Sequence, residues 1–143
     1  MIKLTRRATF SASHYYWNEA WDRAQNERVF GKCANKGGHG HNYTLEVTVA
    51  GEADAVTGFV VDLKALKDVI ESEVLAAYDH RHLNLEVPEF ERAIPTTENI
   101  AIAIWNRLES GLKSHPGMAS ARLYAVRVYE SAGIFAEYRG GAE

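Results

Sequence analysis

The chain has 143 residues, the length of one ordinary domain, and 46% of them are hydrophobic, which favours a folded core over disorder. The formal net charge is −3, so the chain lacks the basic surplus of a general nucleic-acid-binding protein. No apolar run is long enough to span a bilayer, and the polar N-terminal segment does not resemble a signal peptide. A single cysteine excludes an internal disulfide, and we expect a cytoplasmic protein in which residues 1–143 form one domain.

The first predicted strand runs from Leu4 to His14, where every second residue is mostly apolar and His14 ends the apolar series. An aromatic loop, Tyr15 to Trp21, follows. Strict alternation from Asn42 predicts a second, half-buried strand that can pair with the first. Its inward residues are expected to be Tyr43, Leu45, Val47 and Val49.

A turn at Thr57-Gly58 is followed by Phe59–Val61, which we predict as a short strand or a strand extension. The period then becomes helical and predicts a helix from Asp62 to Ala77, with Asp62 as its N-cap. The apolar stripe of this helix is expected to consist of Leu63, Leu66, Ile70 and Val74.

A second helix is predicted after Pro95, with a threonine as its N-cap and Glu98 in its first turn. Its buried stripe is expected to consist of Ile100, Ile104 and Leu108.

Two further strands end the chain, and the turn Ser131-Ala132-Gly133 joins them. In the first, Tyr124, Val126 and Val128 are expected on the apolar side, and the second runs from Ile134 to Tyr138. The order of elements predicts an α+β fold, with a four-stranded antiparallel sheet and two helices on one face. The other sheet face is polar, and it contacts either water or another subunit.

Two histidines one residue apart, His39 and His41, lie just before the second strand in the segment GKCANKGGHGHNYTLEV. In an extended backbone both rings project to the same side, so they can share one metal ion. His14 is the natural third ligand, and three ligands would leave one position open, as in catalytic zinc sites. The alternative is a pair of ordinary loop histidines.

Cys33 lies in a flexible, cationic loop between Lys32 and Lys36 rather than in an apolar run. Positive charge and a nearby metal ion both favour the thiolate form of a cysteine. The residue types leave two roles open: a fourth metal ligand that closes a structural site, or a base beside an open catalytic site.

Three further residues are candidates for chemistry. Asp79 directly precedes His80 after the first helix, and a carboxylate beside an imidazole fixes the tautomer of the ring, although a simple helix cap is the alternative. Glu130 continues the apolar side of its strand, so its inward carboxylate can accept two hydrogen bonds from a ligand with adjacent N–H groups. His82 and His115 are expected at the surface.

On these residues the chain resembles the 6-pyruvoyl-tetrahydropterin synthase family through most of its length. The matching segments keep their order and spacing: FSASH, VFGKCANKGGHGHNYTLEV, VTGFVVDL, YDHRHLN, VPEF, PTTEN and VYES. The resemblance implies the tunnelling fold, in which strands of several subunits form a barrel and active sites lie at subunit interfaces. It also implies a homohexamer made of two trimers.

The resemblance further implies a site for Zn²⁺ and a pterin. The implied metal ligands are His14, His39 and His41. The implied proton-handling residues are Cys33, Asp79 and His80. The implied pterin-binding residues are Glu130, which anchors the ring, and Thr96, Thr97 and Glu98 near it.

The implied activity is that of a zinc-dependent lyase, which eliminates triphosphate from 7,8-dihydroneopterin triphosphate and yields 6-pyruvoyl-tetrahydropterin. Lysine and arginine side chains would hold the triphosphate. The competing activity is 6-carboxy-tetrahydropterin synthase of queuosine biosynthesis, which uses the same substrate and releases acetaldehyde. Five residues, Ala34 to Gly38, separate Cys33 from His39, and this gap favours the pyruvoyl branch because the carboxy enzymes typically have a shorter one. The aromatic loop Tyr15 to Trp21 is a departure that either packs in an interface or reshapes the pocket.

Overall fold

The computed structural model describes residues 1–118 and 120–141. The strands are β1 (Ile2–His14), β2 (His39–Gly51), β3 (Arg81–His82), β4 (Ala121–Ser131) and β5 (Ile134–Tyr138). The helices are α1 (Arg23–Phe30), α2 (Leu63–Ile70), α3 (Ala76–Tyr78), α4 (Leu83–Glu86) and α5 (Thr97–Ser114). A π-helical turn joins α2 to α3, and 3-10 turns lie at Gly31–Ala34, Pro88–Glu91 and Pro116–Met118.

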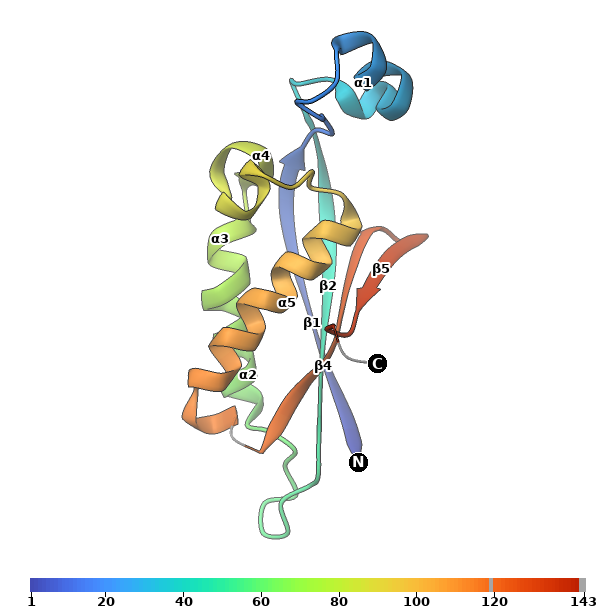
Figure 1. The fold of residues 1–143 in the computed structure, drawn as a ribbon. Coiled ribbons are helices and arrows are strands. Elements are labelled where there is room, and N and C mark those ends of the chain that lie inside the picture. Colours follow the sequence, from blue (N-terminus) through green and yellow to red (C-terminus); the bar gives the residue numbers. More distant parts are fainter. Residues whose placement is uncertain (119, 142–143) are drawn as a thin grey trace.

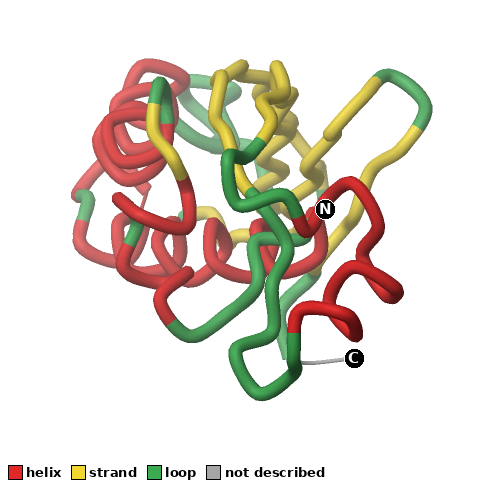
Figure 2. The backbone as a smooth tube through the Cα atoms, turned by 90° about the horizontal axis from the view of Figure 1, so that it is seen from above, coloured by secondary structure: helices red, strands yellow, loops and turns green. Residues whose placement is uncertain are grey.

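The strands form one sheet in the order β3-β1-β2-β4-β5. The four long strands are antiparallel neighbours, and the helices α2, α3 and α5 lie on one side of them (Figures 1 and 2). The predicted α+β architecture is therefore confirmed. The two-residue β3, which pairs in parallel with Ala12 and Ser13 of β1, adds a fifth strand that is too short to show a period in the sequence.

The core lies between this helical layer and the apolar face of the sheet. Tyr43 of β2 is opposite Phe10 of β1, and their rings stack with centroids 4.9 Å apart. The inward residues predicted for β2 are fully buried. On the other face, side chains pair across β1 and β2, for example Thr5 with Thr48 at 2.7 Å and Ser11 with Asn42 at 2.7 Å.

The first predicted helix begins as expected but does not remain a regular α-helix. Asp62 caps α2 by accepting hydrogen bonds from the backbone of Lys64 and Ala65 at 2.8 and 3.3 Å. The π-turn Glu71–Leu75 interrupts it before the helix ends at Tyr78. Leu63 was predicted in the buried stripe but is exposed, because it is the first helical residue and the buried face of α2 consists of Ala65, Leu66, Val69 and Ile70.

Arg107 of α5 forms an ion pair with the 3-10 turn Pro88–Glu91 and a hydrogen bond with the interrupted helix. The guanidinium of Arg107 donates to both carboxylate oxygens of Glu89, at 2.7 and 3.0 Å. It also donates at 3.2 Å to the carbonyl of Glu73, which lies in the π-turn, and the Tyr78 hydroxyl donates to Glu89 at 3.0 Å. Arg107 therefore supplies a donor where the π-turn departs from the helical hydrogen-bond pattern.

Two expectations about strands are wrong. Phe59–Val61 form no strand, because Asp54 closes the preceding turn and the chain then enters α2 directly. The Asp54 carboxylate accepts from the backbone of Val56 and Thr57, and the Asp54 backbone N–H donates to the carbonyl of Phe59. Tyr124 lies on the polar face, where its hydroxyl accepts from Lys3 at 2.7 Å. A bulge opposite Thr48 and Val49 inserts Tyr124 as an extra residue and reverses its side.

Helix α1 was not predicted and lies beyond the ends of β1 and β2 (Figure 1). Its main anchor is Asn26, a buried residue whose amide donates to the carbonyls of Asn18, Trp21 and Asp22. Within the described residues, no helix combines the length and the apolar character that crossing a membrane requires.

Candidate functional site

The pairing of β1 with β2 brings together the three histidines singled out in the sequence. His14 is directly opposite His39, and Ala12 is opposite His41, so all three rings lie at the same end of the two strands. One ligand atom from each ring lies within 4.8 Å of the others, and the Nε2 atoms of His14 and His39 are 3.1 Å apart. This group fits a single metal ion.

His14 is held in the form that a metal ligand needs. Nδ1 of His14 lies 2.8 Å from the carbonyl oxygen of Pro95. Because a carbonyl oxygen can only accept, the proton of the ring is on Nδ1, and the Nε2 lone pair is free to bind a metal ion. The ring is fully buried. Burial, opposed by the bond to Pro95, lowers the pKa of His14 from 6.5 to about 4, so the imidazole is neutral at pH 7.

The chemistry of His41 also fits a metal ion. Its Nε2 atom is buried and makes no hydrogen bond within the described residues, although Oε1 of Glu130 lies 3.4 Å from it. An unpaired buried ring nitrogen is costly, and a bound cation would satisfy it. The Cys33 sulfur does not belong to the ligand group found in the described part of the chain, so three imidazoles, rather than three imidazoles and a thiolate, are assembled.

Glu130 lies at the rim of the histidine group. Its Oε1 atom is 3.4 Å from Nε2 of His41. Its Oε2 atom accepts a hydrogen bond from the Thr97 hydroxyl at 2.8 Å and a longer one from the Tyr16 hydroxyl at 3.4 Å. The inward direction expected for Glu130 is therefore observed, and a half-buried carboxylate is held beside the candidate metal centre.

The other residues expected near Glu130 lie at the start of α5. Thr96 is the N-cap, and its hydroxyl accepts from the backbone of Asn99 at 3.3 Å. Thr97 is buried and directed at Glu130, whereas Glu98 is exposed in the first turn. The helix start thus places one hydroxyl on the carboxylate and uses the other in its own cap.

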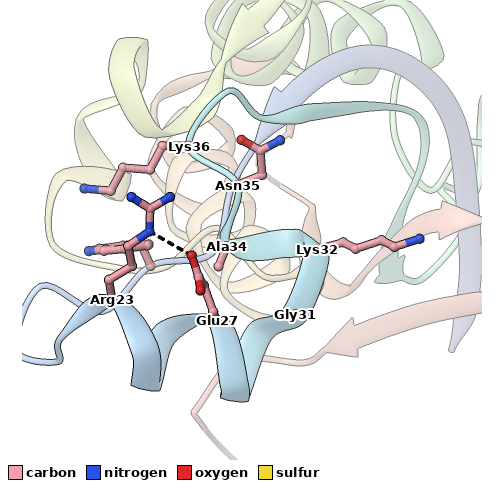
Figure 3. Close-up of a pocket in the computed structure, with 8 residues that line it drawn as sticks. Arg23, Glu27, Gly31, Lys32, Ala34, Asn35 and Lys36 are labelled. Carbon is pink, nitrogen blue, oxygen red and sulfur yellow. Dashed lines mark hydrogen bonds and ion pairs between the residues drawn. The ribbon is translucent and has the colours of Figure 1, made fainter.

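Cys33 lies in the 3-10 turn Gly31–Ala34, and its carbonyl accepts from the backbone of Tyr16 at 2.7 Å. The same turn lines a hollow of about 780 Å³ whose wall includes Trp17, Arg23 and Lys36. Figure 3 shows Arg23 and Lys36 on the same side of the hollow, with Arg23 paired to Glu27 at 2.8 Å, whereas Lys32 points in the opposite direction. Lys36 lies 4.2 Å from the centre of the Trp17 ring, so a cationic hollow borders the cysteine turn.

Asp79 and His80 form a pair but lie outside the histidine group. The Asp79 carboxylate is 3.0 Å from Nδ1 of His80 and accepts from the backbone of Ser11 at 2.9 Å, and this backbone bond is the main cause of the lowered pKa of Asp79. His80 has φ of 59°, which is uncommon for a residue other than glycine, and its side chain is 83% exposed. It lines a hollow of about 470 Å³ at the β1 edge, together with His41.

Two residues near these sites were not anticipated. The Tyr16 hydroxyl contacts Glu130. Tyr16 lies two residues after His14 and so continues the inward side of β1, and this alternation was the feature of the sequence that could have predicted its direction. His82 was expected at the surface but is half-buried beside Tyr15, with ring centroids 5.5 Å apart. No sequence pattern predicted that His82 is half-buried, because this burial depends on the pairing of residues 81 and 82 with β1.

Comparisons with known proteins agree with this arrangement. The sequence model of the family described as 6-pyruvoyl tetrahydropterin synthase matches residues 3–141. The 6-pyruvoyl tetrahydrobiopterin synthase of Homo sapiens is 40% identical over 138 residues, which cover 96% of this chain and 91% of that protein. The solved structure of Caenorhabditis elegans 6-pyruvoyl tetrahydropterin synthase superposes with a TM-score of 0.89 at 36% identity, covering 98% of this chain and 96% of that one. The subunit fold expected from the family resemblance is thereby confirmed.

A more distant relative carries a different name. A protein of Archaeoglobus fulgidus, provisionally named 6-carboxy-5,6,7,8-tetrahydropterin synthase, is 36% identical over 102 residues, which cover 71% of this chain and 75% of that protein. Similarity therefore extends to proteins named for the other reaction considered above.

Proposed function

The chain belongs to the 6-pyruvoyl tetrahydropterin synthase family of pterin-metabolising enzymes, and we propose from this premise that it is a zinc-dependent lyase acting on 7,8-dihydroneopterin triphosphate. The proposed products are 6-pyruvoyl-tetrahydropterin and triphosphate. The observation that carries the proposal is the grouping of His14, His39 and His41, with the carboxylate of Glu130 at its rim. Neither feature would be needed by a protein that only folds.

Zinc is the proposed metal because three neutral imidazoles and an open position are the ligand pattern of catalytic zinc sites. When bound by His14, His39 and His41, the ion would supply Lewis acidity to the side-chain oxygens of the substrate. The neutral state of His14 and the unpaired Nε2 of His41 support this assignment.

Glu130 is the proposed anchor of the pterin ring. The 2-amino group and the adjacent ring N–H of a pterin are parallel donors, which match the two oxygens of a carboxylate. The hydroxyl of Thr97 holds one of these oxygens from the start of α5. Thr96 and Glu98, its neighbours in the chain, are proposed to border the ring.

Cys33 is the proposed base that removes a proton from the substrate side chain. Loss of this C–H proton allows the C–O bond to the triphosphate to break, and the triphosphate leaves with the electron pair of that bond. The cationic hollow beside the Cys33 turn supports a polyphosphate substrate, and Arg23 and Lys36 are the side chains that we assign to it (Figure 3).

Asp79 and His80 are proposed to complete the proton-handling group between copies of the chain. His80 is largely exposed, and it lines a hollow whose wall includes neither Glu130 nor the Cys33 turn, which fits a site assembled from more than one subunit. Within the described residues, β3 covers only a short part of the outer edge of β1, and β5 ends the sheet at the other side. Such edges can pair with other chains, which supports the proposed homohexamer of two trimers and its barrel.

The second candidate is the 6-carboxy-tetrahydropterin synthase reaction, because a relative with that provisional name matches much of the chain. The five-residue gap from Cys33 to His39 favours the pyruvoyl reaction instead. The single thiol supports action in a reducing compartment, for which we propose the cytoplasm.

Incubation with 7,8-dihydroneopterin triphosphate, followed by mass analysis of the products, tests the proposed function. A pyruvoyl product with free triphosphate is expected. A carboxy product with acetaldehyde would instead support the 6-carboxy-tetrahydropterin synthase reaction, and unchanged substrate would contradict both reactions.

A further inference from the structure

Tyr16 touches three separate parts of the candidate site. Its backbone N–H donates to the carbonyl of Cys33 at 2.7 Å, and its hydroxyl donates to Oε2 of Glu130 at 3.4 Å. The edge of its ring meets the ring of His14, with centroids 5.0 Å apart and planes at 75°. One residue therefore connects the cysteine turn, the carboxylate and the histidine group.

The neighbouring tyrosine has none of these contacts. The backbone of Tyr15 exchanges hydrogen bonds with the side chain of Asn84 at 2.9 and 3.0 Å. Its ring faces His82 instead of the histidine group. The aromatic loop thus directs one tyrosine into the site and the other away from it.

The oxygen that Tyr16 contacts is also the one held by Thr97. Both donors act on Oε2 of Glu130, while Oε1 faces His41 at 3.4 Å. Two donors on one oxygen restrict the rotation of the carboxylate more than a single hydroxyl does. A phenol is protonated at pH 7, so the Tyr16 hydroxyl can act as a donor to Glu130.

We propose that Tyr16 is a positioning residue, which orients the Glu130 carboxylate for the pterin ring and fixes the Cys33 turn relative to it. This inference rests on the proposed function, because it assumes that Glu130 receives a pterin. The 3.4 Å contact is long for a hydrogen bond between oxygens. Such contacts in ligand-free sites often shorten when the ligand binds, so Tyr16 acts mainly in the complex.

Titration of neopterin into the metal-loaded protein, followed by its fluorescence, tests this role without depending on turnover. Tyr16→Phe removes only the hydroxyl and is expected to weaken binding about tenfold, the effect of one lost hydrogen bond to a charged group. Metal content and melting temperature should match the wild type. Tyr15→Phe is the matched control and should bind neopterin like the wild type.

A double-mutant cycle shows whether Tyr16 acts through Glu130. In the Glu130→Ala background, with neopterin raised to millimolar concentration, Tyr16→Phe should cause no further loss of affinity. An equal loss in both backgrounds, or unchanged binding by Tyr16→Phe alone, would overturn the inference while leaving the pterin assignment intact. Absence of neopterin binding by the wild type would overturn the pterin assignment, and this inference with it.

Discussion

The hydroxyl of Thr97 donates to the carboxylate of Glu130 at 2.8 Å, although 33 positions separate the two residues in the chain. The contact joins the first turn of α5 to the end of β4. It places a half-buried carboxylate beside His41 and thereby connects the candidate metal centre to a group that can recognise a ligand.

Removal of this carboxylate should abolish recognition of the pterin and leave the metal in place. Glu130→Ala is expected to weaken neopterin binding by about 100-fold, because two hydrogen bonds to a charged group are lost. Thr97→Val keeps the shape of the side chain and should weaken binding about tenfold. Fluorescence titration measures both, and wild-type affinity in Glu130→Ala would remove Glu130 from the ligand site.

His39→Ala should lose the metal, because only two of the three grouped imidazoles would remain. The expected loss of zinc affinity exceeds about 100-fold, which is more than substitutions around a metal ligand typically cause. Competition with a chromogenic chelator gives the affinity. His82→Ala is the control, since this half-buried histidine lies outside the group, and equal zinc loss in the two variants would contradict the ligand assignment.

Cys33→Ala separates chemistry from binding. The variant should keep zinc and neopterin binding, because the thiol belongs to neither set of contacts. Turnover of 7,8-dihydroneopterin triphosphate should fall by at least about 100-fold, the usual contribution of a general base. Product formation followed by mass analysis measures the loss, and full activity in Cys33→Ala would exclude the thiol from the reaction.

Arg107→Ala should destabilise the fold by about 3 kcal/mol, because it leaves the Glu89 carboxylate partly buried without its cation. The carbonyl of Glu73 in the π-turn also loses a donor. Arg23→Ala removes an exposed ion pair with Glu27 and should leave the free energy of unfolding almost unchanged. Urea unfolding at one protein concentration compares them, and equal effects would contradict the structural role of Arg107.

Much of this arrangement could be predicted because strand parity is a strong signal. His14, His39 and His41 lie on the inward side of two strands that pair antiparallel, so their proximity follows from alternation and register. Strand alternation also predicted the inward direction of Glu130, and the preference of aspartate for the N-cap predicted the cap at Asp62. These rules need only the order of residues along one element.

The remaining features depend on contacts between distant segments. Helix α1 has few apolar residues, and its main anchor, Asn26, binds carbonyls of the loop before it. Tyr124 changes sides at a bulge, which interrupts the alternation without marking the sequence. The place of His80 depends on where the chain returns to the edge of β1, and no periodicity in the sequence records this.

X-ray absorption at the zinc edge of the purified protein tests the central claim most directly. We expect a first shell of nitrogen and oxygen atoms, with the outer-shell scattering of three imidazoles and one position filled by solvent. A sulfur in the first shell, or fewer than three imidazoles, would contradict an open centre built from His14, His39 and His41.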